Sequence, residues 1–410
     1  MKVKNNSLIR PGTSEYAPLW PLDPDVVYLN HGSFGACPKW ILERQDAYRM
    51  KLEQEPVRFI LREFEPMQQK AREKLAEFTG AHADDVVFVQ NATTAVNTVF
   101  RSLKFKPGDE ILITNHIYPA CRRTLEYVCE QTGAVLREAC NPFPLDDPEQ
   151  IAEAILQAVT PKVRIALIDH ITAATALVQP VKEIVRELDK RGIDTMVDGA
   201  HALGTVPINL DDLGAAYYTG NCHKWLCAPK ASAILHIRKD KQKGIVPMVI
   251  SHAGAHAEPF SERFFWPATF DPSPLLCAPD MVDYVGSLLP GGWTEVMDRN
   301  RNLCLEARNI LCNVLDVNKP TPDLMVASLA TVLLPTPDKI PSSGYKGADP
   351  LQTHLFQEYG IEVPVWYWGD PPKRLLRISA QLYNNIEQYR YLGERLSAFY
   401  QDEVASLRSQ

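Results

Sequence analysis

Short apolar runs alternate with amphipathic stretches through the middle of this chain. Runs rich in aliphatic and β-branched residues predict strands at 86–90, 110–114, 134–137, 163–169, 195–198, 216–219 and 231–237. Stretches with helical spacing lie between several of them and predict helices at 93–103, 119–131, 148–159 and 180–191. Such alternation is typical of a mostly parallel sheet that is covered by helices on both faces.

The pattern differs on either side of this region. Before it, a proline-rich arm precedes amphipathic patterns that predict helices at 38–54 and 64–80. After about residue 240 we expect, in order, a loop at 251–280, a helix at 294–315, a strand at 325–334, a loop at 335–350, a helix at 351–359, a strand at 375–379 and a helix from about 385. Since 410 residues exceed what one core usually organises, we predict an arm at 1–27, a large domain at 28–290 and a smaller α+β domain at 291–410.

Composition narrows the class of protein. The formal net charge is -7 and no run of Lys and Arg stands out, which argues against a nucleic-acid partner. No stretch of about 18 apolar residues predicts a membrane span, and the two early lysines are not followed by the apolar core of a signal peptide. The nine cysteines include no C-x-x-C pair and suggest neither a disulfide scaffold nor a metal site, so we expect a cytoplasmic protein.

Two segments carry the strongest chemical signal, MVDGAH at 196–201 and GNCHKW at 220–225. Asp198 ends a predicted strand, and Lys224 follows the next one in surroundings that are partly apolar. An acid and an amine at one sheet edge are what pyridoxal 5'-phosphate (PLP) needs, because the amine binds its aldehyde and the acid keeps its pyridine nitrogen protonated. Either residue also has a purely structural interpretation, as a turn-forming aspartate or as a lysine that extends to solvent.

Further polar residues follow other predicted strands. Thr93 and Thr94 in NATTA open a helix whose free N–H groups suit a phosphate, although an ordinary helix cap explains them as well. Tyr118 and its neighbour His116 in TNHIYPA could stack on a cofactor ring or simply pack. In LLRIS, Arg377 has no acid nearby in sequence and suits capture of a carboxylate.

The order of these motifs resembles a known family. YLNHGSFGACP, NATTAVN, MVDGAHALG, GNCHKW and LLRISAQLYN together resemble PLP-dependent enzymes of fold type I, and within them the class V aminotransferases and their isopenicillin N epimerase-like branch. The resemblance extends from about residue 28 to residue 383. It implies an α/β fold with a large PLP-binding domain and a smaller C-terminal domain.

The resemblance also implies a role for each matching residue. Lys224 would join covalently to PLP, Asp198 would pair with the pyridine nitrogen and His201 would approach the phenolic oxygen. The other cofactor contacts would come from Ala92, Thr93, Thr94, His223 and the stacking residue Tyr118. Asn30 and Arg377 would bind the substrate carboxylate. Thr269 would reach the phosphate of a neighbouring subunit, which implies a homodimer with shared sites.

Several reactions remain open after the resemblance. Removal of the Cα proton of an amino acid is common to them, and we favour epimerisation, for which Tyr118 or His116 could be the second acid or base. A C–S lyase that eliminates the side chain of a cysteine derivative is the first alternative, and an aminotransferase the second. A catalytically silent binding protein is the alternative from another class. A cysteine desulfurase is disfavoured, because it needs a mobile cysteine before Arg377 and the last cysteine is Cys312.

Three details bear on specificity without deciding it. Ala173 and Ala174 stand where relatives resembling this chain carry serine and proline, so a side-chain hydrogen bond to the cofactor would be missing. The aromatic clusters at 264–266 and 366–368 could line a pocket for a bulky side chain, or could be core or dimer contacts.

Overall fold

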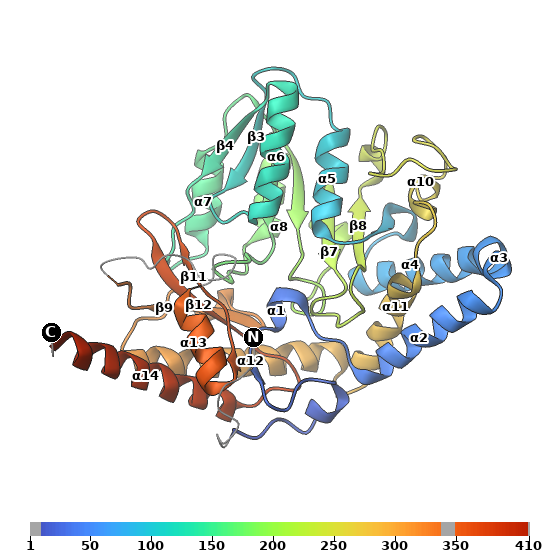
Figure 1. Cartoon of the computed structure of the whole chain (residues 1–410). Coiled ribbons are helices and arrows are strands. Elements are labelled where there is room, and N and C mark those ends of the chain that lie inside the picture. The colour runs from blue at the N-terminus through green and yellow to red at the C-terminus, as the bar shows by residue number, and fades with distance from the viewer. Residues whose placement is uncertain (1–9, 338–348, 409–410) are drawn as a thin grey trace.

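The computed structural model describes residues 10–337 and 349–408, with side chains up to residue 401 (Figure 1). Most of the loop predicted at 335–350 lies outside the described residues. No helix in the described part of the chain is both long enough and apolar enough to cross a membrane.

The centre of the molecule is a seven-stranded sheet, and each of the seven predicted strands is present within a few residues of its expected bounds. Its members are β2 (Val86–Val89), β3 (Glu110–Thr114), β4 (Val135–Ala139), β5 (Val163–Asp169), β6 (Asp194–Asp198), β7 (Tyr217–Asn221) and β8 (Ala233–Ile237). They lie in the order β2-β8-β7-β6-β5-β3-β4, and only β8 runs antiparallel to its neighbours. The prediction of a mostly parallel sheet in an α/β fold is therefore confirmed.

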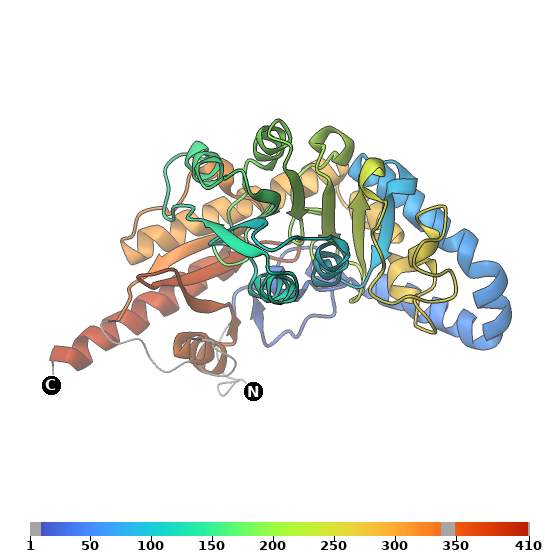
Figure 2. The same cartoon turned by 90° about the horizontal axis from the view of Figure 1, so that it is seen from above.

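Helices cover both faces of this sheet (Figure 2). One face carries α5 (Ala92–Ser102) and α6 (Pro119–Thr132), and the other carries α7 (Glu149–Gln157), α8 (Val181–Asp189) and the short α9 (Leu210–Leu213). Alternate residues of one strand serve the two layers: Ile111 packs in the cluster with α5 and α6, and Leu112 packs in the cluster with α7 and α8. Burial of both faces explains why these strands read as continuous apolar runs.

One edge of the molecule is built from longer helices. They are α2 (Lys39–Gln54), α4 (Phe64–Thr79) and α11 (Ser273–Gly286), and the short α3 (Pro56–Arg58) with a π-turn at Phe59–Glu63 joins the first two. The loop predicted at 251–280 is wrong from Ser273 onward, where α11 begins. Pro274 sits in the first turn, where no helical N–H is needed, and buried residues such as Leu276 and Met281 hold the helix despite Pro279.

A second, three-stranded antiparallel sheet follows in the order β11-β12-β9. It consists of β9 (Leu329–Leu334), β11 (Val365–Trp368) and β12 (Lys373–Ser379), and it packs with α12 (Gly292–Leu315), α13 (Pro350–Tyr359) and α14 (Ile386–Arg408). The strand predicted at 325–334 begins only at Leu329, because Asp323–Met325 forms a 3-10 turn. All of these elements lie in the range predicted as the smaller domain.

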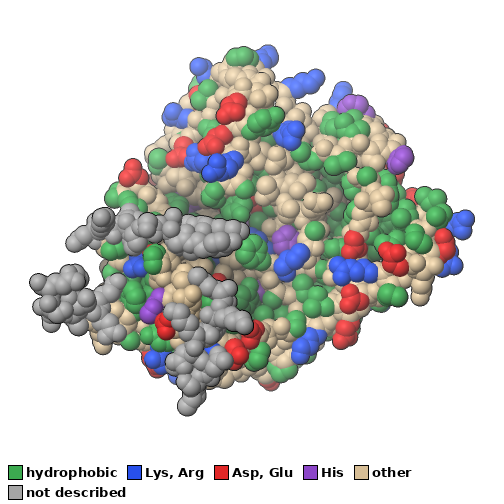
Figure 3. Space-filling model, viewed as in Figure 1, with side chains coloured by type: hydrophobic (Ala, Val, Ile, Leu, Met, Phe, Trp, Pro, Cys, Tyr) green, Lys and Arg blue, Asp and Glu red, His purple; other side chains and the backbone are tan. Residues whose placement is uncertain are grey.

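The N-terminal segment connects the two parts of the chain. The predicted arm contains a 3-10 turn at Ala17–Leu19 and runs into β1 (Val27–Tyr28), which pairs in parallel with β10 (Ile361–Glu362). The four-residue helix α1 (His31–Phe34) follows β1. Acidic and basic side chains are interspersed over the face of the molecule shown in Figure 3.

Candidate active site

Polar residues gather where the parallel strands of the central sheet end. β6 ends at Asp198 and pairs in register with β7, whose last residue is Asn221. Lys224 lies three positions beyond Asn221 in the turn after β7. Two neighbouring parallel strands therefore bring Asp198 and Lys224 to one edge, as their positions after predicted strands led us to expect.

The half-buried Lys224 has its amine held by His201. Lys224 Nζ lies 3.1 Å from His201 Nε2, and Trp225 Nε1 donates to His201 Nδ1 at 3.3 Å. Since an indole N–H can only donate, Nδ1 accepts, and the neutral imidazole carries its hydrogen on Nε2, directed at the amine. A neutral amine is the form that accepts this bond. Burial, with the positive charge of Arg377 next in size, lowers the pKa of Lys224 to about 8.

The backbone at Lys224 is fixed by α1. His31 Nε2 lies 2.9 Å from the Lys224 carbonyl oxygen, and His31 Nδ1 lies 2.8 Å from the Tyr383 hydroxyl. Gly35 has a φ of +72°, and a Cβ there would lie 2.1 Å from the His223 carbonyl oxygen, so only glycine permits this approach. His31 belongs to the quoted YLNHGSFG motif, yet its contact with the Lys224 backbone was not predicted.

Asp198 lies in a buried pocket with few donors. Its Oδ1 accepts from the Ala200 N–H at 3.0 Å, and Cys121 Sγ donates to Oδ2 at 3.5 Å. Burial raises the pKa of Asp198, and the nearby charge of Lys224 opposes that rise. Asp169 is its register partner on β5; burial and the charge of Asp198 raise the pKa of Asp169 well above the usual range. The positively charged partner that Asp198 lacks fits a protonated ring nitrogen.

The first turn of α5 retains free donors. Asn91 Oδ1 accepts from the Thr94 N–H at 2.9 Å, and Ala92 N–H donates to Asn221 Oδ1 at 2.9 Å. The Thr93 N–H has no acceptor among the described residues. The N-terminus of α5 thus offers Thr93 and the positive end of the helix to an anion, whereas the donor predicted at Ala92 is already used within the protein.

The two other residues that were expected near a phosphate are placed differently. His223 is half-buried, its Nδ1 lies 2.9 Å from the Ser232 carbonyl oxygen, and burial lowers its pKa to about 4. Thr269 is exposed on the segment between α10 (Glu262–Phe265) and α11. Its neighbours Pro267 and Phe270 line a cavity of about 520 Å³ together with Thr93 and Thr94.

The two candidates for a second acid or base have unlike surroundings. Tyr118 precedes α6 with 44% of its surface exposed, and the charges of Asp198 and Arg377 act on its hydroxyl, whose pKa burial raises. His116 is buried elsewhere: its Nδ1 lies 2.7 Å from Thr175 Oγ1 and its ring packs on Trp368 at 4.5 Å. Burial lowers the pKa of His116 to about 4. The structure brings Tyr118, but not His116, toward the other site residues.

Arg377 is a buried cation without a contacting carboxylate. It donates through Nη1 to the Ala173 carbonyl and through Nη2 to Ser33 Oγ at 3.2 Å, and it lies 5.1 Å from the centre of the Trp366 ring. Its Nε is buried and has no partner. Burial lowers the pKa of Arg377 to about 10. A buried guanidinium with an unused donor requires an anion, and the carboxylate of an amino acid supplies one.

The two aromatic clusters differ in their contacts. Phe265 and Trp266 pack on Phe64, with ring centroids 5.2 and 6.3 Å away, and are core residues. Trp366 instead contacts Arg377 at the candidate site, and Trp368 packs on His116 outside it.

These groups fit PLP. Lys224 offers a neutral amine for the aldehyde, Asp198 a buried carboxylate for the ring nitrogen, and Thr93 with the α5 N-terminus free donors for the phosphate. Bound PLP supplies an electron sink for a carbanion at the Cα of an amino acid.

Comparisons with known proteins agree with this fit. A family model described as Aminotransferase class-V matches residues 35–259. The chain is 32% identical over 391 residues to an isopenicillin N epimerase of Streptomyces clavuligerus, covering 92% of this chain and 96% of that protein. It is 30% identical over 404 residues to a probable chloroplastic L-cysteine desulfhydrase of Arabidopsis thaliana, covering 93% and 84% respectively.

Solved structures share the fold. A cysteine desulfurase from Thermococcus onnurineus NA1 superposes with a TM-score of 0.76 at 18% identity, covering 96% of this chain and 100% of that one. The cystine C-S lyase C-DES, in complex with cysteine persulfide, superposes with a TM-score of 0.73 at 20% identity, covering 91% and 98%. The fold, the match to the family model and the relatives over most of the length agree, and the chain belongs to the class-V aminotransferase family of PLP-dependent enzymes.

Proposed function

We propose that this protein removes the Cα proton of an amino acid with the Lys224 amine, and that β-elimination from a cysteine derivative is its reaction. The observation that carries the proposal is the half-buried amine of Lys224, with its pKa near 8, beside a buried Arg377 that has an unused donor. Arg377 would hold the substrate carboxylate, and the neutral amine is the form that accepts a proton.

The contacts of the candidate groups favour a mechanism in which Lys224 is the single base over one that needs a second base. β-Elimination needs only Lys224 and a leaving group, and it converts a cysteine derivative and water into pyruvate, ammonia and a thiol. His116 is engaged by Thr175 and Asn141, and the raised pKa of Tyr118 makes that phenol a poor base. Relatives described as L-cysteine desulfhydrases match more than nine-tenths of this chain, which supports the lyase.

Epimerisation is the second candidate, and the position of Tyr118 favours it. A raised pKa suits an acid that returns a proton, and the charges of both Asp198 and Arg377 act on this hydroxyl. The isopenicillin N epimerases match over 92% of the chain.

One experiment separates these reactions. The purified holoenzyme is incubated in D2O with L-cysteine and S-alkyl cysteines, and pyruvate, thiol and the stereochemistry of the recovered amino acid are measured. Pyruvate and thiol without inversion at Cα support the lyase. Inversion with deuterium at Cα and no pyruvate contradicts it, and Tyr118→Phe should then abolish inversion.

We also propose a cytoplasmic homodimer. The exposed Thr269 and the exposed apolar residues Met248, Val249 and Ile250 support a partner subunit over the cavity beside Thr93. The nine unpaired cysteines support a reducing compartment. Sedimentation of the holoenzyme tests the dimer, and a monomer at micromolar concentration contradicts it.

A further inference from the structure

A continuous chain of hydrogen bonds joins Arg377 to Glu362. Arg377 Nη2 donates to Ser33 Oγ at 3.2 Å. The Ser33 hydroxyl donates to Asn30 Oδ1 at 2.5 Å, and Asn30 Nδ2 donates to Glu362 Oε1 at 3.1 Å. A cation thus stands at one end of the chain and an acid at the other, with two neutral side chains between them.

The two ends fix the direction of every bond in this chain. A guanidinium can only donate and an ionised carboxylate can only accept. Ser33 therefore accepts from Arg377 and donates onward, and the Asn30 amide places its oxygen toward Ser33 and its nitrogen toward Glu362. An amide between two neutral groups could adopt either orientation, but here the charged ends leave one.

The backbone holds these four side chains in place. β1 and β10 pair Tyr28 with Glu362, and the Leu29 N–H donates to the Glu362 carbonyl at 3.0 Å. The Gly32 N–H donates to Ser379 Oγ at 3.1 Å, which ties α1 to the strand that carries Arg377. Glu362 and Arg377 thus lie on hydrogen-bonded strands, Ser33 lies in α1, and Asn30 lies between β1 and α1.

Asn30 and Arg377 each have one N–H group that makes no hydrogen bond to the described residues. Asn30 Nδ2 carries two hydrogens, of which Glu362 takes one. Arg377 Nε is buried and unpartnered. The second Asn30 hydrogen is the donor that a substrate carboxylate can use beside the Arg377 guanidinium.

We propose that Glu362 is a positioning residue for the substrate carboxylate, because its own carboxylate locks the Asn30 amide in the orientation that presents N–H groups to a ligand. The proposal rests on the function proposed above, in which Arg377 binds that carboxylate. Glutamine at position 362 can donate as well as accept, so the Asn30 amide loses its fixed direction. A reversed amide presents its oxygen in place of N–H donors, and oxygen repels a carboxylate.

The test compares two ligands that differ only in the carboxylate. Wild-type and Glu362→Gln holoenzymes are titrated with L-alanine and with ethylamine, and binding is followed by the absorbance of bound PLP. We expect Glu362→Gln to weaken L-alanine binding about tenfold and to leave ethylamine binding unchanged. In turnover, KM should rise and kcat should stay the same.

Three further variants test whether the effect is a general loss of structure. Ser33→Ala breaks the hydrogen-bond chain at its Arg377 end, and it should weaken L-alanine binding while leaving ethylamine binding unchanged. The double variant should bind L-alanine no more weakly than the weaker-binding single variant. Glu387→Gln on α14 is the matched control, since Glu387 is exposed and pairs only with Arg390 among the described residues. It should behave as wild type.

The outcomes separate this proposal from the proposed function. Equal weakening for both ligands, or effects of Ser33→Ala and Glu362→Gln that add in full, would overturn the positioning role of Glu362. Retention of the full preference for L-alanine in Glu362→Gln would overturn it too. A wild-type holoenzyme whose spectrum responds to neither ligand contradicts the proposed function itself.

Discussion

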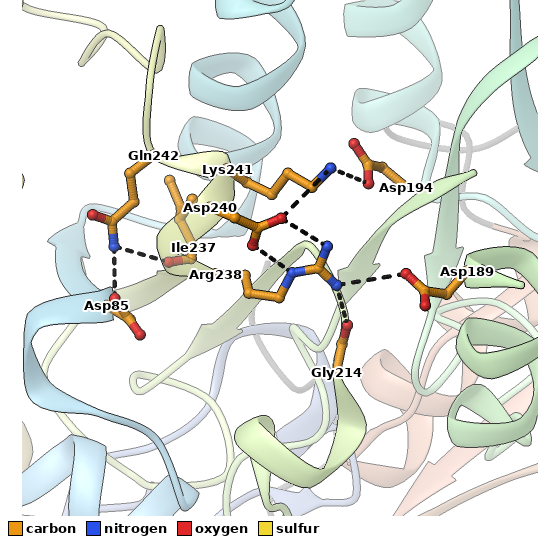
Figure 4. A network of polar contacts seen from close by, with 9 residues as sticks. All are labelled: Asp85, Asp189, Asp194, Gly214, Ile237, Arg238, Asp240, Lys241 and Gln242. Carbon is orange, nitrogen blue, oxygen red and sulfur yellow. Dashed lines mark hydrogen bonds and ion pairs between the residues drawn. The ribbon is translucent and has the colours of Figure 1, made fainter. Parts of the chain in front are cut away.

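The charged side chains at one edge of the central sheet are paired with opposite charges, and those at the other edge are not. At the edge where β6 begins, Arg238 Nε donates to Asp240 at 2.7 Å and its Nη1 lies 3.7 Å from Asp189 (Figure 4). Lys241 Nζ in turn lies 2.8 Å from Asp194. Arg238, Lys241 and these three aspartates each have an opposite charge in contact and are partly exposed. Asp85 in the same view accepts from the neutral Gln242.

At the edge where β6 ends, Asp198 and Arg377 are buried and Lys224 is half-buried, and none of the three contacts an opposite charge among the described residues. Lys224 contacts a neutral imidazole, Asp198 contacts a thiol and a backbone N–H, and Arg377 contacts a carbonyl and a hydroxyl. Burying a charge without a countercharge costs free energy, so a fold retains such an arrangement where a ligand completes it. The paired edge is therefore structural, and the unpaired edge is the one prepared for PLP and substrate.

Removing the Lys224 amine should have the largest effect of any single change. Lys224→Ala deletes the group that we propose both anchors PLP and moves the Cα proton, and we expect kcat to fall by about 10³-fold or more. Borohydride followed by mass spectrometry should find PLP fixed to the wild-type chain and not to the variant. A variant that keeps more than a tenth of the wild-type rate would contradict the assignment of the active site to the edge where β6 ends.

Removing the buried cation should come next. Arg377→Gln leaves a substrate carboxylate without its charged partner, and we expect kcat/KM for L-cysteine derivatives to fall about 100-fold. PLP should stay bound, because Arg377 is assigned to substrate and not to cofactor. Steady-state kinetics and the absorbance of bound PLP check both statements, and loss of PLP with an unchanged KM is the contrary result.

The lowered pKa of Lys224 predicts the pH dependence of cofactor loading. Only the neutral amine attacks an aldehyde, so attachment of PLP to the apoprotein should speed up with rising pH and level off above about 8. Below that pKa the neutral fraction falls about tenfold per pH unit. Stopped-flow absorbance measures the rate, and a midpoint near the ordinary lysine value of 10.5 would contradict the effect of burial.

The paired edge should show the smallest effect. Arg238→Gln removes the centre of the network in Figure 4, and solvent screening of these partly exposed groups should limit the loss of unfolding free energy to less than about 1 kcal/mol. Catalytic constants should not change. Urea denaturation and steady-state assays measure the two quantities, and a tenfold loss of activity would contradict a purely structural role for the paired edge.

The central sheet was predictable because its strands are buried on both faces. Runs such as EILIT at 110–114 and VRIALID at 163–169 match β3 and β5 residue for residue. Proline misled the prediction at α11, where Pro274 and Pro279 suggested a loop while the buried face of the helix decided the outcome. The short β11, with its half-buried aromatic residues, offered no clear alternation.

The positions of residues in sequence motifs were predicted better than the contacts between residues far apart in the sequence. The positions of Lys224 and Asp198 follow from strand ends, which a sequence pattern reveals. The engagement of His116 by Thr175 and of Asp198 by Cys121 depends on packing between distant segments. Glu362 carries no local signal at all, since its partner Asn30 lies 332 positions earlier.

That separation sets when the enzyme becomes selective during its synthesis. The parallel pairing of β1 with β10 waits until residue 361 has left the ribosome, because Val27 meets Ile361. A nascent chain can assemble the PLP-facing strands up to β8 well before this closure. The carboxylate-binding group that we propose around Asn30 and Arg377 therefore assembles only after β10 and β12 have been synthesised.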